Sequence, residues 1–418
     1  MKTITIINAY GEKNIGDAAI QESALNFLNK MIDSKDRFFL LSVDSYRYKK
    51  NPQFQAKIIQ RQLPYGYAIQ SSSKPLSRIH KLYRFTKITI FSLSYTFFPS
   101  INKKMIQKNS LYEYIQAIID ADIVIGMGGG YLTSRYVMSD NFGLLLTLLP
   151  VYIAKKYHKK IIFFPLTFGP FANTTHTKIT HKILANTTVF FREKFSLEKV
   201  KKMNSKKYFV DAMYTPDLAL FLDSPSSKKS KKEDNYYVIT AREWLIKGQQ
   251  DQYEKELSTF IKKTWNEKKL RAIFIPMAYN AIEDDDRRVA NRISKKLNNK
   301  HIFTIMYPNN PNEVQKILQR AKFAICTRMH SAILSFTTET PFVTIAYSPK
   351  TNYFLKDFGL SEWNINIEDF NAELLDDKIE KLTMRKNQDH FIKNIKMHKT
   401  HLNKQKKEFE SFLYDFIN

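Results

Sequence analysis

Arg328 and His330 place a cation and a proton donor two positions apart, with Met329 between them. They follow an apolar run at 323–326 and precede a helix-like segment at 331–338. A strand, a polar turn and a helix in this order bring the polar residues to the carboxyl edge of a parallel sheet, where open α/β folds bind ligands. A guanidinium suits a phosphate or a carboxylate, and a histidine exchanges a proton near neutral pH. The pattern therefore predicts an anion site with a proton donor beside it.

A second candidate site follows the first predicted strand, at residues 3–7. The turn after it holds Asn14, Gly16 and Asp17, just before a predicted helix. Backbone N–H groups at the start of a helix favour negative charge, although the spacing matches neither a dinucleotide fingerprint nor a P-loop. Asp17 equally suits a capping role at that helix start. Both a ligand-binding and a purely structural role stay open for this turn.

Three consecutive glycines, Gly128, Gly129 and Gly130, follow a further predicted strand that begins at Ile123. Without side chains, this backbone can fold closely around a ligand, but it can also simply form a tight turn. The sequence favours neither interpretation over the other.

Two further arginines, Arg192 and Arg242, each come just past a predicted strand. For Arg192 the alternative to ligand binding is an ordinary ion pair at the surface. The acidic run at 283–286 enters a predicted helix, and consecutive carboxylates rarely converge on one ion. A helix N-terminus enriched in acid explains it better than a metal site, so no metal is expected.

The chain has 418 residues, enough for two domains, and 66 Lys and Arg against 40 Asp and Glu give a formal charge of +26. This surplus favours an anionic partner, either an acidic membrane surface or a phosphorylated substrate, unless it is only a solvated basic surface. No nucleic-acid-binding module is recognised, so nucleic acid is not an expected partner.

The single cysteine, Cys326, cannot form an internal disulfide, and its apolar surroundings indicate a buried small side chain. This fits a reducing cytoplasm. The N-terminus lacks the cleavage site of a signal peptide, and no run reaches the ~18 apolar residues of a membrane span. We therefore expect a cytoplasmic protein.

A basic and aromatic insertion lies near 78–104, with its apolar part at 88–98. Aromatic and aliphatic residues flanked by cations suit an interfacial segment on anionic lipid. The alternative is a hairpin or helix that packs on its own domain. The first interpretation predicts peripheral contact with the inner face of the cell membrane.

Strand and helix patterns alternate along the chain and restart after a polar stretch, which predicts parallel sheets in two domains. We expect an N-terminal domain at 1–223, a linker at 224–235, a C-terminal domain at 236–385 and a Lys-rich helical tail at 386–418. The predicted fold class is α/β, with two Rossmann-like, doubly wound domains facing each other across a cleft, as in the GT-B architecture.

The motifs resemble those of the polysaccharide pyruvyltransferase family. In order along the chain, the matching segments are residues 10–20 (YGEKNIGDAAI), 128–132 (GGGYL), 191–196 (FREKFS), 215–219 (TPDLA), 275–277 (IPM) and 327–350, which begins TRMHSA and ends YSPK. The resemblance runs from about residue 4 to residue 355. Glu193 stands where an aspartate is commoner in the family, and the insertion and the tail have no obvious counterpart there.

The resemblance implies transfer of a pyruvyl group from phosphoenolpyruvate to two hydroxyls of a sugar, with a cyclic ketal and phosphate as products and no cofactor. The acceptor would belong to a cell-envelope or capsular polysaccharide precursor, and the sequence leaves open whether it is lipid-linked. The donor carries a carboxylate and a phosphate, which Arg328 and Arg192 would clamp and near which Met329 would lie. Lys350 and Arg242 would add positive potential.

His330 is the predicted acid that protonates the methylene carbon of the donor. A histidine that merely starts a helix is the alternative. Asp17, with Asn14, is the candidate for orienting or deprotonating the acceptor hydroxyl. Gly16 and the glycines at 128–130 complete the predicted acceptor side.

Two other classes of function are weighed against this one. A GT-B glycosyltransferase would need a base-stacking site and a carboxylate for the ribose in the second domain, and neither is clear in the sequence. Glu313 is a candidate for the carboxylate, but it lies at a predicted helix start. A basic binding protein without catalysis would have no need of Arg328 and His330.

Overall fold

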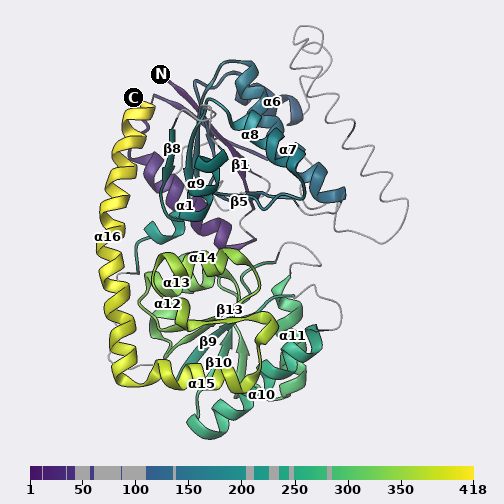
Figure 1. Cartoon of the computed structure of the whole chain (residues 1–418), viewed down its shortest axis with the longest axis vertical. Coiled ribbons are helices and arrows are strands. Elements are labelled where there is room, and N and C mark those ends of the chain that lie inside the picture. Colours follow the sequence, from purple (N-terminus) through teal and green to yellow (C-terminus); the bar gives the residue numbers. More distant parts are fainter. Residues whose placement is uncertain are drawn as a thin grey trace. The chain divides into compact units, whose positions relative to one another are not determined.

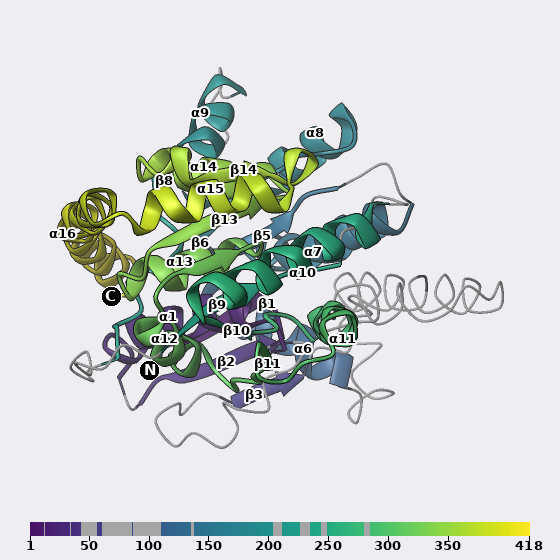
Figure 2. The ribbon, with the colours of Figure 1, turned by 90° about the horizontal axis from the view of Figure 1, so that it is seen from below.

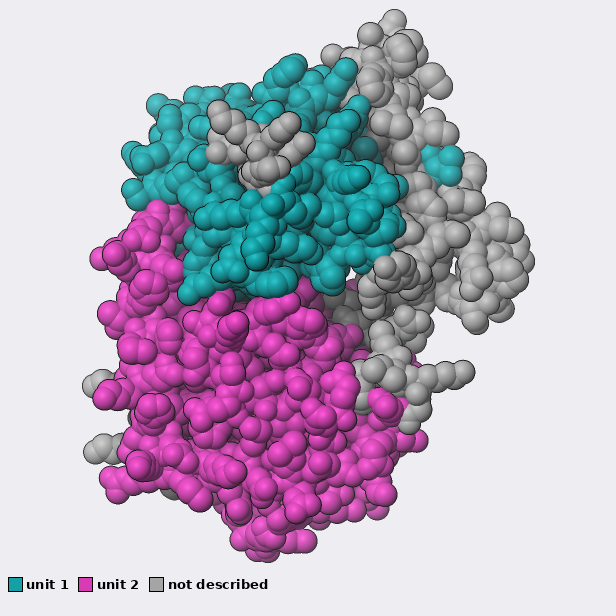
Figure 3. Space-filling model, in the orientation of Figure 1, with its two compact units in different colours: residues 1–12, 20–218, 410–418 teal, residues 13–19, 219–409 magenta. Residues whose placement is uncertain are grey.

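The computed structural model describes residues 1–11, 13–33, 35–42, 57–60, 86, 110–134, 138–203, 211–225, 235–243, 249–279 and 285–418. The chain forms two compact units (Figure 3). Unit 1 comprises residues 1–12, 20–218 and 410–418, and unit 2 comprises residues 13–19 and 219–409. The turn at 13–19, which the sequence assigns to the domain at 1–223, therefore belongs to unit 2.

Unit 1 contains, within its described residues, an eight-stranded parallel sheet with the order β3-β2-β1-β4-β6-β7-β8, in which β5 pairs with β6. Its strands are β1 (Thr3–Ala9), β2 (Arg37–Ser42), β3 (Lys57–Gln60), β4 (Ile123–Gly126), β5 (Gly129–Leu132), β6 (Lys160–Phe168), β7 (Thr188–Phe191) and β8 (Asp211–Tyr214). Its helices are α6 (Ser110–Ile119), α7 (Met138–Lys156), α8 (Thr174–Leu184), α9 (Lys194–Met203) and most of α1 (Ile15–Asn29).

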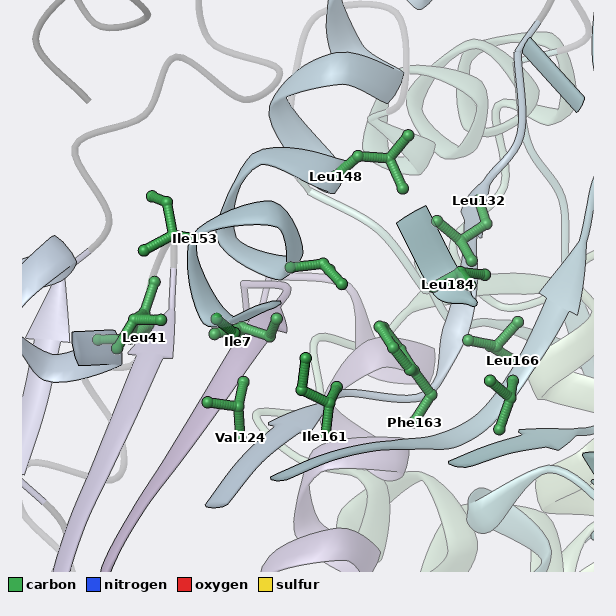
Figure 4. Close-up of a cluster of buried hydrophobic side chains, with 14 of the residues drawn as sticks. Ile7, Leu41, Val124, Leu132, Leu148, Ile153, Ile161, Phe163, Leu166 and Leu184 are labelled. Atoms are coloured by element: carbon green, nitrogen blue, oxygen red, sulfur yellow. The ribbon is translucent and has the colours of Figure 1, made fainter. Parts of the chain in front are cut away.

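Apolar side chains of the central strands fill the space beneath α7 and α8 (Figure 4). Val124, Ile161 and Phe163 point from β4 and β6 toward Leu148 and Ile153 of α7. Strands buried on both faces read as continuous apolar runs, as these do, so the parallel arrangement follows from the composition of the strands.

Unit 2 contains, among the residues described, a six-stranded parallel sheet of order β11-β10-β9-β12-β13-β14. The strands are β9 (Tyr236–Thr240), β10 (Arg271–Phe274), β11 (Phe303–Ile305), β12 (Ala324–Cys326), β13 (Phe342–Ala346) and β14 (Asn364–Asn366). The strand order reverses between β9 and β12. In doubly wound folds, the carboxyl ends of the strands at this switch point form the ligand-binding crevice.

Helices cover both faces of the sheet of unit 2 (Figure 1). On one face α12 (Pro311–Arg320) packs on α13 (Met329–Thr337), which also contacts α14 (Pro349–Asp357). On the other face α10 (Gln250–Lys268) packs on α11 (Asp286–Leu297) and α15 (Ala372–Thr383). In Figure 2, α15 is seen along its length, whereas the long C-terminal helix, α16, is seen end-on. The last helix, α16 (Arg385–Ile417), has its final turns in unit 1.

The predicted fold class is confirmed, since each unit is a doubly wound, Rossmann-like α/β structure. The insertion near 78–104 lies outside the described residues apart from Thr86, and the predicted linker is described only at its two ends. In the part of the chain that is described, no helix has both the length and the apolar content needed to cross a membrane.

Candidate functional site

Three cationic side chains follow three neighbouring strands of unit 2. Arg242 comes after β9, Arg328 after β12 and Lys350 after β13, in the sheet order β9-β12-β13. Because neighbouring parallel strands lie roughly 4.8 Å apart and end at the same edge, these residues start from adjacent positions beside the switch point. The residues of unit 2 that are predicted to bind the donor thus follow strands that end at one edge of the sheet.

Arg328 is held by Asp286, a member of the acidic run that the sequence explains only as a helix start. Its Nη2 donates to Oδ1 of Asp286 at 2.6 Å, and its Nε donates to Oδ2 at 3.2 Å. Asp286 is fully buried at the first position of α11, and the Arg328 side chain is 11% exposed. A two-point ion pair of this kind fixes the plane of the guanidinium.

The same carboxylate holds the chain just after β10. Oδ2 of Asp286 accepts hydrogen bonds from the backbone N–H groups of Met277 at 3.0 Å and Ala278 at 3.1 Å. This segment then pairs with the N-terminal turn, because Ile15 N–H donates to the Met277 carbonyl at 2.8 Å and Asn14 forms an antiparallel bridge with Ala278. This pairing explains why residues 13–19 belong to unit 2.

Asn14 begins helix α1. Its Oδ1 accepts hydrogen bonds from the N–H groups of Gly16 at 2.9 Å and Asp17 at 3.4 Å. Asn14 therefore performs the capping role that the sequence offered to Asp17. Asp17 lies half-buried in the first turn of the helix, where its negative charge complements the helix dipole.

Gly16 lies directly against the imidazole of His330. A Cβ atom added to Gly16 would stand only 2.2 Å from Nδ1 of His330 and 2.4 Å from its Cγ. Only glycine permits this approach. The contact joins the N-terminal turn to the start of α13, so the structure brings together Asn14, Gly16, Arg328 and His330 in unit 2. Met329, at the start of the same helix, is half-buried.

The other two cations of this edge have neighbours of their own. The Arg242 guanidinium lies 4.3 Å from the centre of the Tyr347 ring, and both side chains are half-buried. Lys350 lies in the first turn of α14, where its N–H donates to Oγ of the N-cap Ser348 at 3.3 Å. Stacking on an aromatic face holds a guanidinium in place while it keeps its charge.

Arg192, in contrast, lies in unit 1 and is bound by two carboxylates. Its Nη1 donates to Asp217 at 2.6 Å and its Nε to Glu193 at 3.0 Å, with Oγ1 of Thr167 also at 2.8 Å. Burial by itself would lower the pKa of Arg192, but Glu193 and Asp217 raise it above the usual value. Arg192 is only 6% exposed, so the ion pair is a buried one and not the surface pair offered as the alternative. These contacts favour a structural role, and donor binding by Arg192 stays a prediction.

The glycine loop lies at the corresponding switch point of unit 1, just after β4, and its last two residues, Gly129 and Gly130, begin β5. A Cβ on Gly128 would stand 2.6 Å from the Pro165 carbonyl oxygen, and Gly129 has a φ of +134°, so both positions require glycine for backbone reasons. The loop leads to Tyr131, whose ring centre lies 5.5 Å from that of Tyr10. Both rings are half-buried. The sequence did not predict this contact between two tyrosines that lie far apart along the chain.

Among the described residues, no group of three or more His, Cys, Asp or Glu is placed to hold a metal ion. Of the acidic run at 283–286, Asp285 caps α11 by accepting the N–H of Arg287 and Asp286 binds Arg328, whereas the first two members lie outside the described residues. Burial raises the pKa of the Cys326 thiol to about 11, which suits an inert core side chain.

A sequence model described as polysaccharide pyruvyl transferase matches residues 14–349 of this chain. The chain belongs to this family. Amylovoran biosynthesis protein AmsJ of Erwinia amylovora is 24% identical over 286 residues, which are 61% of this chain and 65% of that relative, so the match spans less than two thirds of its length. The matched residues include the turn with Asn14 and Gly16 as well as the Arg328–His330 segment.

The fold is shared with solved structures of low sequence identity. A UDP co-structure of MnaA from S. aureus is 11% identical with a TM-score of 0.54, covering 94% of this chain and 91% of that one. The α,α-trehalose 6-phosphate synthase of Burkholderia multivorans is 10% identical with a TM-score of 0.54, covering 100% and 96%. These likenesses show the GT-B-like α/β fold of the family member.

Proposed function

We propose that this family member transfers the pyruvyl group of phosphoenolpyruvate to two hydroxyls of a sugar in a polysaccharide precursor, forming a cyclic ketal. Family membership supports pyruvyl transfer as the reaction. A relative named for the biosynthesis of amylovoran supports a polysaccharide as the acceptor. The observation that carries the proposal is the placement of Arg328 beside a histidine, His330, at the switch point of unit 2.

The donor is a small trianion at neutral pH, so its site needs several cations. Arg242, Arg328 and Lys350 follow three neighbouring strands, and one of the three charges is offset by Asp286. A guanidinium has five N–H donors, and the two hydrogen bonds to Asp286 orient it without removing its charge. In this proposal Arg328 binds the phosphate or the carboxylate of the donor, and Arg242 and Lys350 supply further positive potential.

The transfer begins when His330 gives a proton to the methylene carbon of the donor, which becomes the methyl group of the product. The neighbouring carbon gains oxocarbenium character, and a sugar hydroxyl adds to it and releases its proton. The C–O bond to phosphate then breaks, and a second hydroxyl closes the ketal. Of the two hydroxyl protons, one restores His330 and the other leaves with the phosphate.

Within unit 2, Asn14 and Asp17 are the candidates for orienting the acceptor hydroxyl, and within unit 1 the glycine loop is a separate candidate for contact with the sugar ring. In the loop, Tyr131 and Tyr10 offer aromatic faces, which pack well on the apolar face of a sugar ring. Replacement of Tyr131 by leucine should raise the KM for the saccharide and leave the KM for phosphoenolpyruvate unchanged. An unchanged saccharide KM would remove this part of the proposal.

We further propose a cytoplasmic reaction at the inner face of the cell membrane. The charge of +26 and the basic, aromatic insertion near 78–104 motivate contact with anionic lipid. In flotation with liposomes, the protein should float with anionic vesicles and stay behind with neutral ones. Equal behaviour with both kinds of vesicle would count against membrane contact.

The deciding experiment compares donors. Phosphoenolpyruvate should raise the melting temperature of the protein, because a ligand stabilises the folded state that binds it. It should also release phosphate when a suitable saccharide is added, with a mass gain of one pyruvyl group on the sugar. UDP-sugars form the comparison set, since the protein shares its fold with a UDP-bound structure. Stabilisation by a UDP-sugar alone would instead point to a glycosyltransferase.

A further inference from the structure

Asp286 touches two parts of the candidate site at once. Its carboxylate is fully buried and receives four hydrogen bonds, two from the Arg328 guanidinium and two from the backbone N–H groups of Met277 and Ala278. A buried carboxylate with this many donors is strongly held, because hydrogen bonds to a charged group are stronger than neutral ones. Asp286 is therefore a fixed point for both neighbours.

One neighbour leads to the proposed acid. The segment that Asp286 holds receives the N–H of Ile15 at the Met277 carbonyl and bridges to Asn14 at Ala278. The next residue of the turn, Gly16, lies against the His330 imidazole. Gly16 therefore limits the position of the imidazole, and the turn that contains Gly16 is held by the segment that Asp286 binds.

The other neighbour, Arg328, leads to His330 as well. Arg328, which Asp286 binds directly, is the N-cap residue of the helix that carries His330 in its first turn. The guanidinium and the imidazole are thus set by one carboxylate along two routes, directly and through the paired segments. A residue that acts in this way affects donor binding through the guanidinium and the rate through the imidazole, because it fixes the geometry between the two groups.

We propose that Asp286 is the positioning residue of the site, which sets the Arg328 guanidinium and the His330 imidazole relative to each other. This inference rests on the proposed function. It assigns a role to a carboxylate that acts through Arg328 and through the backbone of Met277 and Ala278. It predicts that the guanidinium and the imidazole lose their alignment together when the charge of Asp286 is removed.

Asp286→Asn is the first test, because the amide oxygen can still accept the N–H groups of Met277 and Ala278 while the charge and the second acceptor toward Arg328 are lost. We expect kcat/KM for phosphoenolpyruvate to fall about 10- to 100-fold, with both a higher donor KM and a lower kcat. Asp285→Asn is the matched control at the same helix start. It removes a carboxylate that binds Arg287, and kcat/KM should stay within about twofold of the parent value.

A purely structural role would lower the melting temperature and the active fraction but leave the donor KM unchanged. A second variant, Ile15→Pro, removes the N–H that donates to Met277 and leaves Asp286 and Arg328 untouched. Proline is tolerated at the first position of a helix. This variant should lower kcat with little change in donor KM, and it decides the matter if Asp286→Asn fails to fold.

Unchanged donor KM and kcat in folded Asp286→Asn, or unchanged kcat in Ile15→Pro, would overturn the inference alone. A parent protein that neither binds phosphoenolpyruvate nor releases phosphate from it would overturn the proposed function and this inference with it. The two failures are distinguishable, because the first requires an active parent protein.

Discussion

The imidazole of His330 rests on the Cα atom of Gly16, with no room between them for even a methyl group. The two residues come from opposite ends of the family match, and the contact gives a structural reason for glycine in the N-terminal turn. It also makes the position of the proposed acid depend on the backbone of Gly16, a residue without a side chain.

Gly16→Ala should therefore displace the imidazole. The added Cβ would stand 2.2 Å from Nδ1, and a displacement of about 1 Å can cost on the order of 100-fold in rate. We expect kcat to fall by that order, measured as phosphate release. Gly143→Ala in α7 is the control, since no described atom outside its chain neighbours and the backbone of its own helix lies within 4 Å of the added Cβ. The kcat of this variant should equal that of the parent protein.

Replacing His330 and Arg328 should separate catalysis from donor binding. His330→Ala removes the proton donor, so phosphate release should fall about 100- to 10,000-fold while phosphoenolpyruvate still raises the melting temperature. Arg328→Ala should weaken both, because it removes a cation of the donor site. A His330→Ala variant that turns over at the normal rate would assign the acid to another residue.

The buried pair of Arg192 and Asp217 should matter for stability. Asp217→Ala leaves part of the Arg192 charge without its partner, and loss of one member of a buried pair costs about 3 kcal/mol or more of unfolding free energy. Urea denaturation measures this. Lys30→Ala breaks the exposed Lys30–Glu410 pair of the same unit and should cost less than about 1 kcal/mol. Equal losses in the two variants would contradict a structural role for the Arg192 pair.

The stability of the protein should decrease in mild acid because of His181. This residue of α8 is 7% exposed, and burial lowers its pKa below the usual 6.5. As the pH falls below 6.5, the unfolded chain takes up the proton before the folded one does, so the free energy of unfolding declines.

The comparison of pH 7.5 with pH 5.5 tests this by urea denaturation. His181→Gln should lose less stability between the two pH values than the parent protein, because its side chain does not titrate. His390→Gln, at an exposed position of α16, should behave like the parent. A decline in His181→Gln that equals or exceeds that of the parent protein would show that another group is responsible.

Local patterns in the sequence predicted the fold class and the strands that carry the site. The periodicity of apolar residues within a strand or helix predicts that element from its own residues. The strand before Arg328, the helix after His330 and the alternation of strands and helices in both units could therefore be predicted. The Asn14 turn was predicted as a possible site for the same reason, since the residues that cap a helix lie within four positions of its start.

Contacts between distant segments could not be read in this way. Asp286 stands 42 positions before Arg328. No feature of the acidic run distinguishes it from Asp285, which binds Arg287 instead. Arg192 looked like Arg328, a cation just past a strand, yet its surroundings hold two carboxylates. Whether such an arginine meets a ligand or a buried partner depends on what the rest of the fold places opposite it.

The amino-acid order alone determined two parallel sheets, an Arg-x-His segment at a strand end and a helix that starts in the turn with Asn14 and Asp17, because these follow from residue periodicity and turn chemistry over short stretches. Tertiary structure alone decided that Asp286 forms an ion pair with Arg328 and that Gly16 contacts His330. The pairing of far segments is set by how the layers pack, and a linear pattern carries no record of which side chains then meet.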